Sequence, residues 1–224
     1  MDKMQTIEAS DDHQFNAYGV QASERALANL VVIQEIFGVN KHIRSVADGF
    51  AADGFNVLAP AIFDRIQRNV ELPYDDEGLG IGRELKAAME LDPVLLDIKA
   101  CIDNFNNELP TSVIGYCFGG KLAFASSRLT GLHRCIGYYG GAIPELLPQE
   151  RNCPVQLHFG EMDHSIPTAE IETIRQQCPD VDIHVYANAG HGFNCDQRSQ
   201  YHADSATLAR QRSLSFLRDD FSTG

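Results

Sequence analysis

A cysteine held between glycines is the first group in this sequence that could do covalent chemistry. Residues 113–120 read VIGYCFGG, so Cys117 follows an apolar β-branched run and stands between Gly115 and Gly119. Small neighbours let a strand and the next helix approach closely while the side chain between them stays exposed. A helix N-terminus also stabilises a thiolate. The pattern indicates a nucleophile, although a buried structural cysteine in a glycine-rich turn would leave the same pentapeptide.

Two further reactive groups follow strand-like runs later in the chain. Asp163 stands in GEMDHSIP after the run VQLHFG, and His191 stands in ANAGHGFN after VDIHVYA. A lone loop aspartate is more often a turn former, and a histidine between glycines is more often a surface residue. The order cysteine, acid, histidine at three strand ends is nevertheless the order of α/β-hydrolases. Together the three residues predict a nucleophile, an acid and a base.

Alternating strand-like and helix-like segments predict how these groups are positioned. Buried strands are expected at LVVIQEI, FNVLAP, TSVIGY, HRCIGYYG, PVQLHFG and VDIHVYA. Helices are expected at FGVNKHIRSVADGFAADG, at GKLAFASSRLTG, near 168–177 and at HADSATLARQRSLSFLRDDF. Such alternation predicts an α/β fold, a mostly parallel sheet with helices on both faces. Ligands bind such sheets at the carboxyl ends of the strands.

Other segments depart from this alternation. The runs MQTIEA and QFNAYGV, separated by SDDH, predict two antiparallel strands at one edge. Residues 61–80 hold Pro73, glycines and mixed charges, which predicts a long loop over the face where strands end. The helical stretch 81–109 contains Pro93, which must interrupt or kink it.

Composition excludes several classes of function. The chain has 224 residues with 44% hydrophobic content, so we expect one domain over residues 1–224. A formal charge of −13 disfavours nucleic acid and anionic membranes as partners. The sequence shows neither a secretory signal pattern nor a run of roughly 20 apolar residues, so a soluble cytoplasmic protein with reduced cysteines is expected.

Several blocks of the sequence together resemble one known family. QEIFGVN, GYCFGG, GYYG, GEMDHSIP and AGHGFN look like the signature blocks of the dienelactone hydrolase family, cysteine-dependent members of the α/β-hydrolase fold. The blocks run from about residue 31 to 194, and SLSFL is similar to the final helix, so the resemblance covers nearly the whole chain. It implies the α/β-hydrolase fold, a small lactone or ester as substrate, and no metal or organic cofactor.

The resemblance also assigns roles to individual residues. The family's nucleophile falls on Cys117, its acid on Asp163 and its base on His191. A further glutamate of the family falls on Glu35, where it is implied to hold the thiol proton until substrate displaces it. A glutamate at the end of a buried strand needs a partner or a raised pKa, which suits this role. The alternative is that Glu35 faces solvent or caps the next helix.

The implied reaction is acyl transfer through a thioester. The Cys117 thiolate attacks the carbonyl carbon, and the backbone N–H groups of Phe118 and Ile36 form the oxyanion hole. His191, oriented by the acid, protonates the leaving alkoxide and then activates water.

The residues that bind substrate are less well defined by the sequence. Tyr74, Arg83 and Tyr139 are expected at the pocket mouth. Arg83 and Arg68 both stand in the region of the first arginine with which the family binds a substrate carboxylate. Family members that act on carboxylate-bearing lactones use a second arginine four residues after the catalytic histidine, and that position is Cys195 here. The nearest arginine, Arg198, lies three residues further on. We therefore expect neutral lactones or esters to be better substrates than anionic ones.

Other functions remain open at this point. A dinucleotide site would need a G-x-G-x-x-G motif after the first buried strand, and QEIFGVNKH lacks it. Zinc could be held by His191, Cys195 and His202, although their spacing is unlike that of common zinc sites. A catalytically silent binding protein, a general carboxylesterase or a thiol-sensitive peptidase could share the same fold. The sequence leaves open whether the protein is a monomer or a homodimer.

Overall fold

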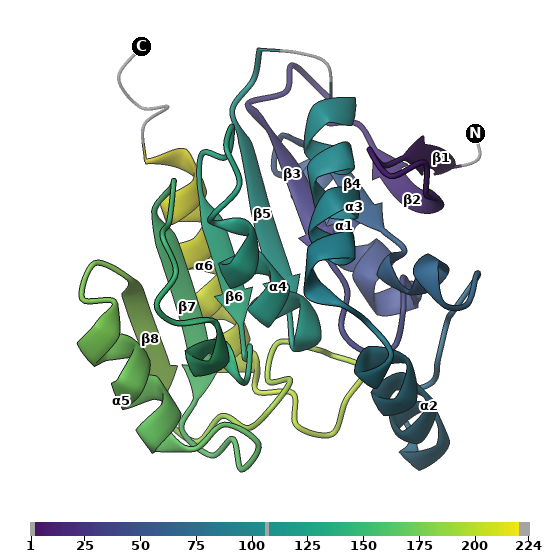
Figure 1. Cartoon of the computed structure of the whole chain (residues 1–224). Coiled ribbons are helices and arrows are strands. Elements are labelled where there is room, and N and C mark those ends of the chain that lie inside the picture. The colour runs from purple at the N-terminus through teal and green to yellow at the C-terminus, as the bar shows by residue number, and fades with distance from the viewer. Residues whose placement is uncertain (1–2, 106–107, 220–224) are drawn as a thin grey trace.

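The continuous apolar runs of the sequence form the centre of an eight-stranded sheet (Figure 1). The structure, a computed structural model, describes residues 3–105 and 108–219. The strands are β1 Met4–Glu8, β2 Gln14–Val20, β3 Ala28–Ile33, β4 Phe55–Pro60, β5 Thr111–Tyr116, β6 Cys135–Tyr138, β7 Val155–Gly160 and β8 Asp182–Tyr186. Every residue of β3 to β7 is buried, as expected for strands covered on both faces.

The strand order is β1-β2-β4-β3-β5-β6-β7-β8. β1 pairs antiparallel with β2, and β2 pairs antiparallel with β4, which confirms the predicted pair of edge strands. All pairings from β4 to β8 are parallel. The carboxyl ends of these six strands therefore meet at one edge of the sheet.

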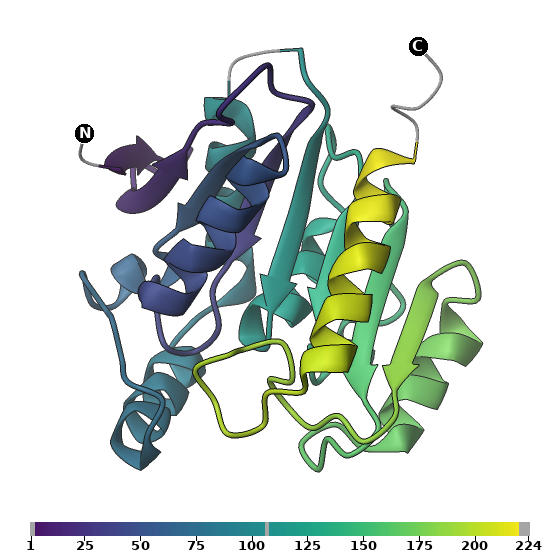
Figure 2. The same cartoon turned by 180° about the vertical axis from the view of Figure 1, so that it is seen from behind.

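Helices cover both faces of the sheet. They are α1 Lys41–Ala52, α2 Asp76–Ala87, α3 Leu91–Asn104, α4 Phe118–Ser126, α5 Thr168–Gln177 and α6 Ala203–Arg218, with 3-10 helices η1 Ile62–Arg65 and η2 Ile143–Leu146. α3, α4 and α5 lie on the face turned toward the viewer in Figure 1, and α1 and α6 lie on the opposite face in Figure 2. None of the described helices is both long and apolar enough to cross a membrane.

Two expectations about the segment before β5 need correction. The predicted loop over residues 61–80 contains η1 and the first residues of α2, so its irregular part is residues 66–75. The predicted helix over residues 81–109 is two helices, and the break lies before Pro93 rather than at it. Pro93 occupies the first turn of α3, where a backbone N–H has no intrahelical acceptor and its absence costs little. Residues 106–107 of this prediction, and 220–221 of the predicted last helix, lie outside the described residues.

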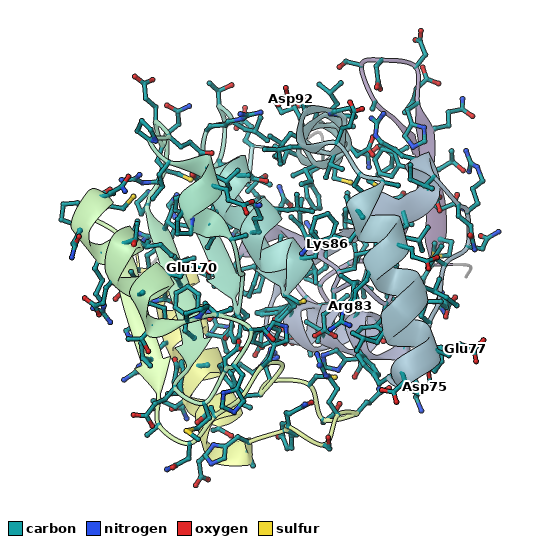
Figure 3. All side chains as sticks on the ribbon, turned by 60° about the horizontal axis from the view of Figure 1, so that its bottom comes forward. Asp75, Glu77, Arg83, Lys86, Asp92 and Glu170 are labelled. Atoms are coloured by element: carbon teal, nitrogen blue, oxygen red, sulfur yellow. The ribbon has the colours of Figure 1, made fainter. Side chains whose placement is uncertain are left out.

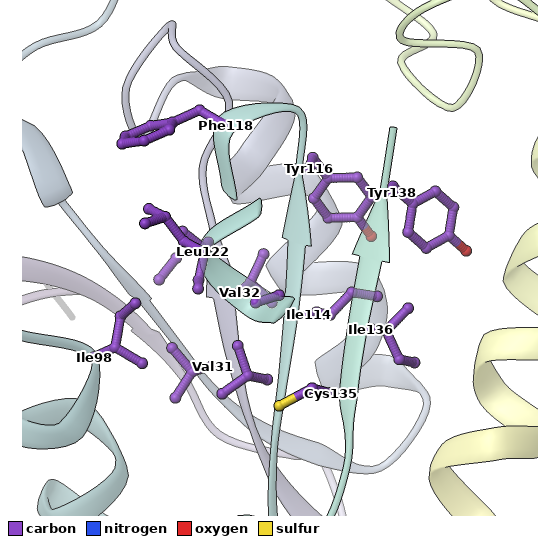
Figure 4. Close-up of a cluster of buried hydrophobic side chains, with 14 of the residues drawn as sticks. Val31, Val32, Ile98, Ile114, Tyr116, Phe118, Leu122, Cys135, Ile136 and Tyr138 are labelled. Atoms are coloured by element: carbon purple, nitrogen blue, oxygen red, sulfur yellow. The ribbon is translucent and has the colours of Figure 1, made fainter. Parts of the chain in front are cut away.

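The core fixes α4 against the middle of the sheet. Leu122 of α4 lies in the buried core on the same side of the sheet as Val31 of β3 and Cys135 of β6 (Figure 4). Each of these side chains is at most 2% exposed. Because α4 begins immediately after Cys117, this packing determines where the thiol stands relative to the sheet.

Candidate active site

Cys117 stands at a strained turn between β5 and α4. Its backbone has φ 55° and ψ −115°, a conformation that residues other than glycine rarely adopt. A Cβ added to Gly115 would lie 1.9 Å from the carbonyl oxygen of Gly119, and one added to Gly119 would lie 2.5 Å from that of Gln34. The glycines of the motif are therefore required because strand and helix touch there. This is the steric reason that the sequence suggested.

Three strand ends bring the cysteine, the histidine and the aspartate together. His191 Nε2 lies 3.2 Å from Cys117 Sγ, and His191 Nδ1 lies 2.8 Å from Asp163 Oδ2. The Asp163 side chain is completely buried, and its other oxygen accepts the backbone N–H of Ser165 at 2.8 Å. The histidine therefore bridges the thiol and a fixed carboxylate. This is the arrangement of a nucleophile, its base and the group that orients the base.

The surroundings of His191 favour its charged form. Burial opposes the positive charge, but the hydrogen bonds with Asp163 and Cys117 outweigh it and raise the pKa of His191 to about 10. A protonated His191 stands 3.2 Å from the sulfur, so it can give its proton to a leaving group bound there.

Backbone donors adjoin the thiol. Phe118 is the first residue of α4, so its N–H has no acceptor within the helix. Ile36 follows β3 by three residues, and both residues line the same cavity as Cys117. Among the described residues, neither N–H donates a hydrogen bond to another protein group. Both are therefore available to an oxygen bound near the sulfur.

A cavity of about 440 Å³ opens above these groups at the carboxyl edge of the sheet. Its walls come from α2, α4, α5 and the loops that follow β3, β6, β7 and β8. The charged residues that line it are Arg83, Lys86, Lys121, Arg198 and Glu170. Figure 3 shows Arg83 and Lys86 on α2, across the opening from Glu170 on α5. Four of these five side chains are cationic, although Lys121 pairs with Glu145 and Arg198 pairs with Glu35, and the whole chain carries a charge of −13.

Glu35 is buried beside the cavity and fully paired. It is 0% exposed, its Oε2 accepts the Tyr74 hydroxyl at 2.7 Å, and its Oε1 lies 3.3 Å from Arg198 Nη1. The Arg198 guanidinium also lies over two aromatic rings, at 5.7 and 5.8 Å from their centres. Glu35 therefore neither faces solvent nor caps a helix. In this structure the Cys117 thiol contacts His191 rather than Glu35.

The residues expected to bind substrate lie in three different settings. Arg83 lines the cavity. Tyr139 lies beside His191, with its ring 5.2 Å from the His191 ring and its hydroxyl without a hydrogen-bond partner among the described residues. Cys195 is fully buried and lies outside the cavity lining. Arg198 reaches the cavity instead, from a loop whose sequence shows no periodicity that could have placed it.

The zinc ligands considered from the sequence do not assemble. His191 is engaged by Asp163 and Cys117. His202 caps the N-terminus of α6, where its side chain accepts the backbone N–H of Ser205.

A different trio could meet a metal ion. Ligand atoms of Glu35, His42 and Cys195 lie within 4.8 Å of one another, and all three residues are buried. However, the Tyr74 hydroxyl hydrogen-bonds both Glu35 and Cys195, and Arg198 pairs with the carboxylate. A metal ion would have to displace the tyrosine and tolerate the guanidinium, so this donor set does not fit a resident metal.

Comparison with known proteins agrees with the fold. The model of the dienelactone hydrolase family matches residues 15–221. The chain is 36% identical over 202 residues to a Synechocystis protein provisionally named carboxymethylenebutenolidase, with 82% of each chain covered. It is 30% identical over 223 residues to the carboxymethylenebutenolidase of Pseudomonas putida, with 95% of this chain and 94% of that one covered.

A solved structure gives the same result. A provisionally named dienelactone hydrolase from Klebsiella pneumoniae superposes with a TM-score of 0.83 at 26% identity and covers 95% of each chain. The family resemblance and the fold class expected from the sequence are thereby confirmed. The chain belongs to the dienelactone hydrolase family and is a hydrolase with the α/β-hydrolase fold.

Proposed function

We propose that this hydrolase opens a small lactone, or cleaves a small ester, through a thioester formed on Cys117. The observation that carries the proposal is the continuous contact from Asp163 through His191 to the Cys117 sulfur, at 2.8 and 3.2 Å, on the floor of a cavity. No other group in the cavity lining combines a nucleophile with an oriented base. The reaction class follows from this arrangement.

The steps follow from the positions of the groups. The thiolate attacks the carbonyl carbon, and the N–H groups of Phe118 and Ile36 stabilise the oxyanion. The His191 imidazolium gives its proton to the leaving alkoxide, which leaves a neutral base. That base then takes a proton from water, whose attack on the thioester releases the acid and the thiolate and restores the imidazolium. Asp163 keeps the ring in one orientation and stabilises its charge.

Glu35 is proposed to couple substrate binding to the state of the thiol. Its carboxylate is held by Tyr74 and by one contact of 3.3 Å from Arg198. An anionic group of the substrate that pairs with Arg198 would compete for this contact and release Glu35. The released carboxylate could then take the thiol proton, as the family resemblance implies. The thiol would reach its reactive form only when the cavity is occupied.

The preferred substrate is proposed to be a lactone that carries a carboxylate. Four cationic residues line the cavity against Glu170, and the relatives are named for a carboxymethylene-bearing butenolide. The expectation of a neutral substrate was based on Cys195, an uncharged residue at the position of the family arginine. Arg198 supplies a cation in the cavity despite that substitution, so the proposal here replaces the expectation. Arg83 offers a second charge from α2.

The decisive experiment compares a carboxylated dienelactone, its neutral methyl ester and an aryl acetate as substrates before and after iodoacetamide treatment. We expect the carboxylated lactone to have the highest kcat/KM and alkylation to abolish all turnover. Cys117→Ala should lower kcat by roughly 10⁴-fold or more, whereas Cys153→Ser, a thiol away from the cavity, should not. Preference for the aryl acetate would favour a general carboxylesterase. Absence of turnover with every substrate would favour a silent binding protein.

A further inference from the structure

A second cysteine site lies at the opposite edge of the sheet from Cys117. Cys135 is the first residue of β6, and Cys153 precedes β7 by two residues. β6 and β7 are parallel neighbours in which Cys135 pairs with Val155, so both cysteines lie at the amino ends of these strands. Their sulfur atoms are 3.6 Å apart, and both are free thiols. A small movement of either side chain would bring the sulfurs to bonding distance.

The two thiols differ in exposure and in acidity. Cys135 is fully buried, and burial raises its pKa. Cys153 is only partly buried. Its pKa is lowered by the hydrogen bond with Cys135 and, against the effect of burial, by the charge of Arg134. A partly exposed thiol of lowered pKa beside a buried thiol is the arrangement of an attacking and a resolving cysteine.

We propose that Cys135 and Cys153 are an oxidation site that forms a reversible intrachain disulfide on reaction with a low-molecular-weight disulfide such as oxidised glutathione. The Cys153 thiolate attacks one sulfur of glutathione disulfide, which gives a mixed disulfide and one glutathione thiolate. The Cys135 thiol then attacks the Cys153 sulfur and releases the second glutathione as its thiol. The two protein thiols are oxidised, and one glutathione disulfide is reduced to two thiols.

The disulfide would restrain the connection between β6 and β7, which forms one wall of the cavity. The connection from β6 to β7 contains the short helix η2 rather than an α-helix, and it carries Gly141 and Ala142 in the cavity lining. A bond between Cys135 and Cys153 closes the loop that contains this whole connection. Closing the loop restricts the unfolded chain and so stabilises the folded one. The reacting groups lie at the other edge of the sheet and keep their geometry.

The test uses the wild-type protein treated with oxidised glutathione, blocked with iodoacetamide and digested with trypsin. Cleavage after Arg134 and Arg151 places the two cysteines in separate peptides, residues 135–151 and 152–175. We expect these peptides to be joined, and dithiothreitol to separate them. The oxidised protein should also melt roughly 5–10 °C higher than the reduced one.

Matched variants separate this site from the other cysteines. Cys153→Ser should give neither the joined peptides nor the rise in melting temperature, whereas Cys101→Ser, which removes a buried thiol on α3, should give both. All of these proteins keep Cys117, so any reaction of glutathione with Cys117 affects each of them equally. The proposal is overturned if wild-type Cys153 keeps glutathione as a stable mixed disulfide, stays unmodified, or joins a different cysteine. Each of these outcomes is read directly from the peptide masses and requires no variant to fold.

Discussion

Two buried carboxylates in this protein are each paired with an arginine, and the two pairs are built differently. Asp97 of α3 and Glu35 are both 0% exposed, and the side chains of Arg65 and Arg198 are 13% and 14% exposed. Asp97 receives two short hydrogen bonds from Arg65, at 2.7 and 2.6 Å. Glu35 has one contact of 3.3 Å with Arg198 and relies on a tyrosine for the other oxygen.

The surroundings of the two arginines explain the difference. Arg65 is also held by Asp11, so its guanidinium is fixed by two carboxylates. Arg198 lies over aromatic rings and borders the cavity. A bidentate pair gains both energy and fixed geometry, whereas a single long contact can be exchanged for another anion. We infer that the Asp97 pair maintains the fold and that the Glu35 pair is built to be opened by substrate.

The largest effect is expected from breaking the fixed pair. Arg65→Met leaves Asp97 buried without its cation, which should lower the free energy of unfolding by about 3–5 kcal/mol. Burial already raises the pKa of Asp97 to about 6. A carboxyl whose folded pKa is raised loses stability as pH rises through that value, and removing Arg65 raises the pKa further. Urea unfolding should therefore show a larger deficit near pH 8 than near pH 5, and an equal deficit would contradict this account.

The second prediction concerns the pair that is built to open. Glu35→Gln keeps the shape and can still accept the Tyr74 hydroxyl, and Arg198 can be solvated from the cavity. The melting temperature should therefore change by no more than about 3 °C. The rate of thioester formation should fall roughly ten- to a hundredfold if the carboxylate handles the thiol proton. Asp97→Asn is the matched control: its unfolding should change and its kcat should not.

Stopped-flow acylation and the iodoacetamide reaction rate of Cys117 distinguish the role of Glu35 from a merely structural one. We expect a non-hydrolysable carboxylated lactone analogue to speed alkylation of the wild-type thiol and to have no such effect in Glu35→Gln. If the analogue speeds alkylation equally in both proteins, Glu35 has no part in activating the thiol.

The third prediction concerns the arginine of the same pair. Arg198→Met should raise KM for a carboxylated lactone about tenfold or more, because a charge-assisted hydrogen bond contributes roughly 1.5–3 kcal/mol. KM for its neutral methyl ester should stay nearly unchanged. Arg210→Met is a suitable control, since Arg210 pairs with Asp53 away from the cavity. An equal rise in KM for both substrates would mean that Arg198 maintains the structure of the site rather than binds the substrate carboxylate.

Glu35 could be singled out from the sequence, but the residues that pair with it could not. Apolar runs and the glycines around Cys117 are local signals, so the strands, and the positions of Cys117, Asp163 and His191 at their ends, could be predicted from the sequence. Glu35 stood out as a charge at the end of an apolar strand. Its partners did not, because Tyr74 and Arg198 come from irregular loops that carry no periodic pattern. Contacts between such loops depend on the whole fold.

The same limit explains the remaining differences. Cys195 was expected at the substrate because it stands four residues after His191, but in the loop after β8 it is Arg198 that lines the cavity, and Cys195 is buried. Pro93 was expected to break a helix, and it instead occupies a first turn, where proline is tolerated. The residue types of Cys195 and Pro93 marked these positions as unusual in the sequence. The course of the backbone around each residue determines what it does in the fold.

The smallest effect is expected at the outer end of the fixed pair, where Asp11 binds the same guanidinium as Asp97 but its side chain is 36% exposed. The hydrogen bond from Arg65 lowers the pKa of Asp11, the opposite direction to Asp97. A lowered folded pKa contributes stability above the unfolded value of about 3.9 and loses it as pH falls through the folded value.

Because solvent and salt screen the contact between Asp11 and Arg65, Asp11→Asn should lower the free energy of unfolding by less than about 1 kcal/mol at neutral pH. Urea unfolding should show that deficit shrinking toward about pH 3, while the Arg65→Met deficit grows with pH. If Asp11→Asn lowered the free energy of unfolding at neutral pH as much as Arg65→Met does, the exposed contact would be as strong as the buried one. Burial would then not explain the difference between the two contacts of Arg65.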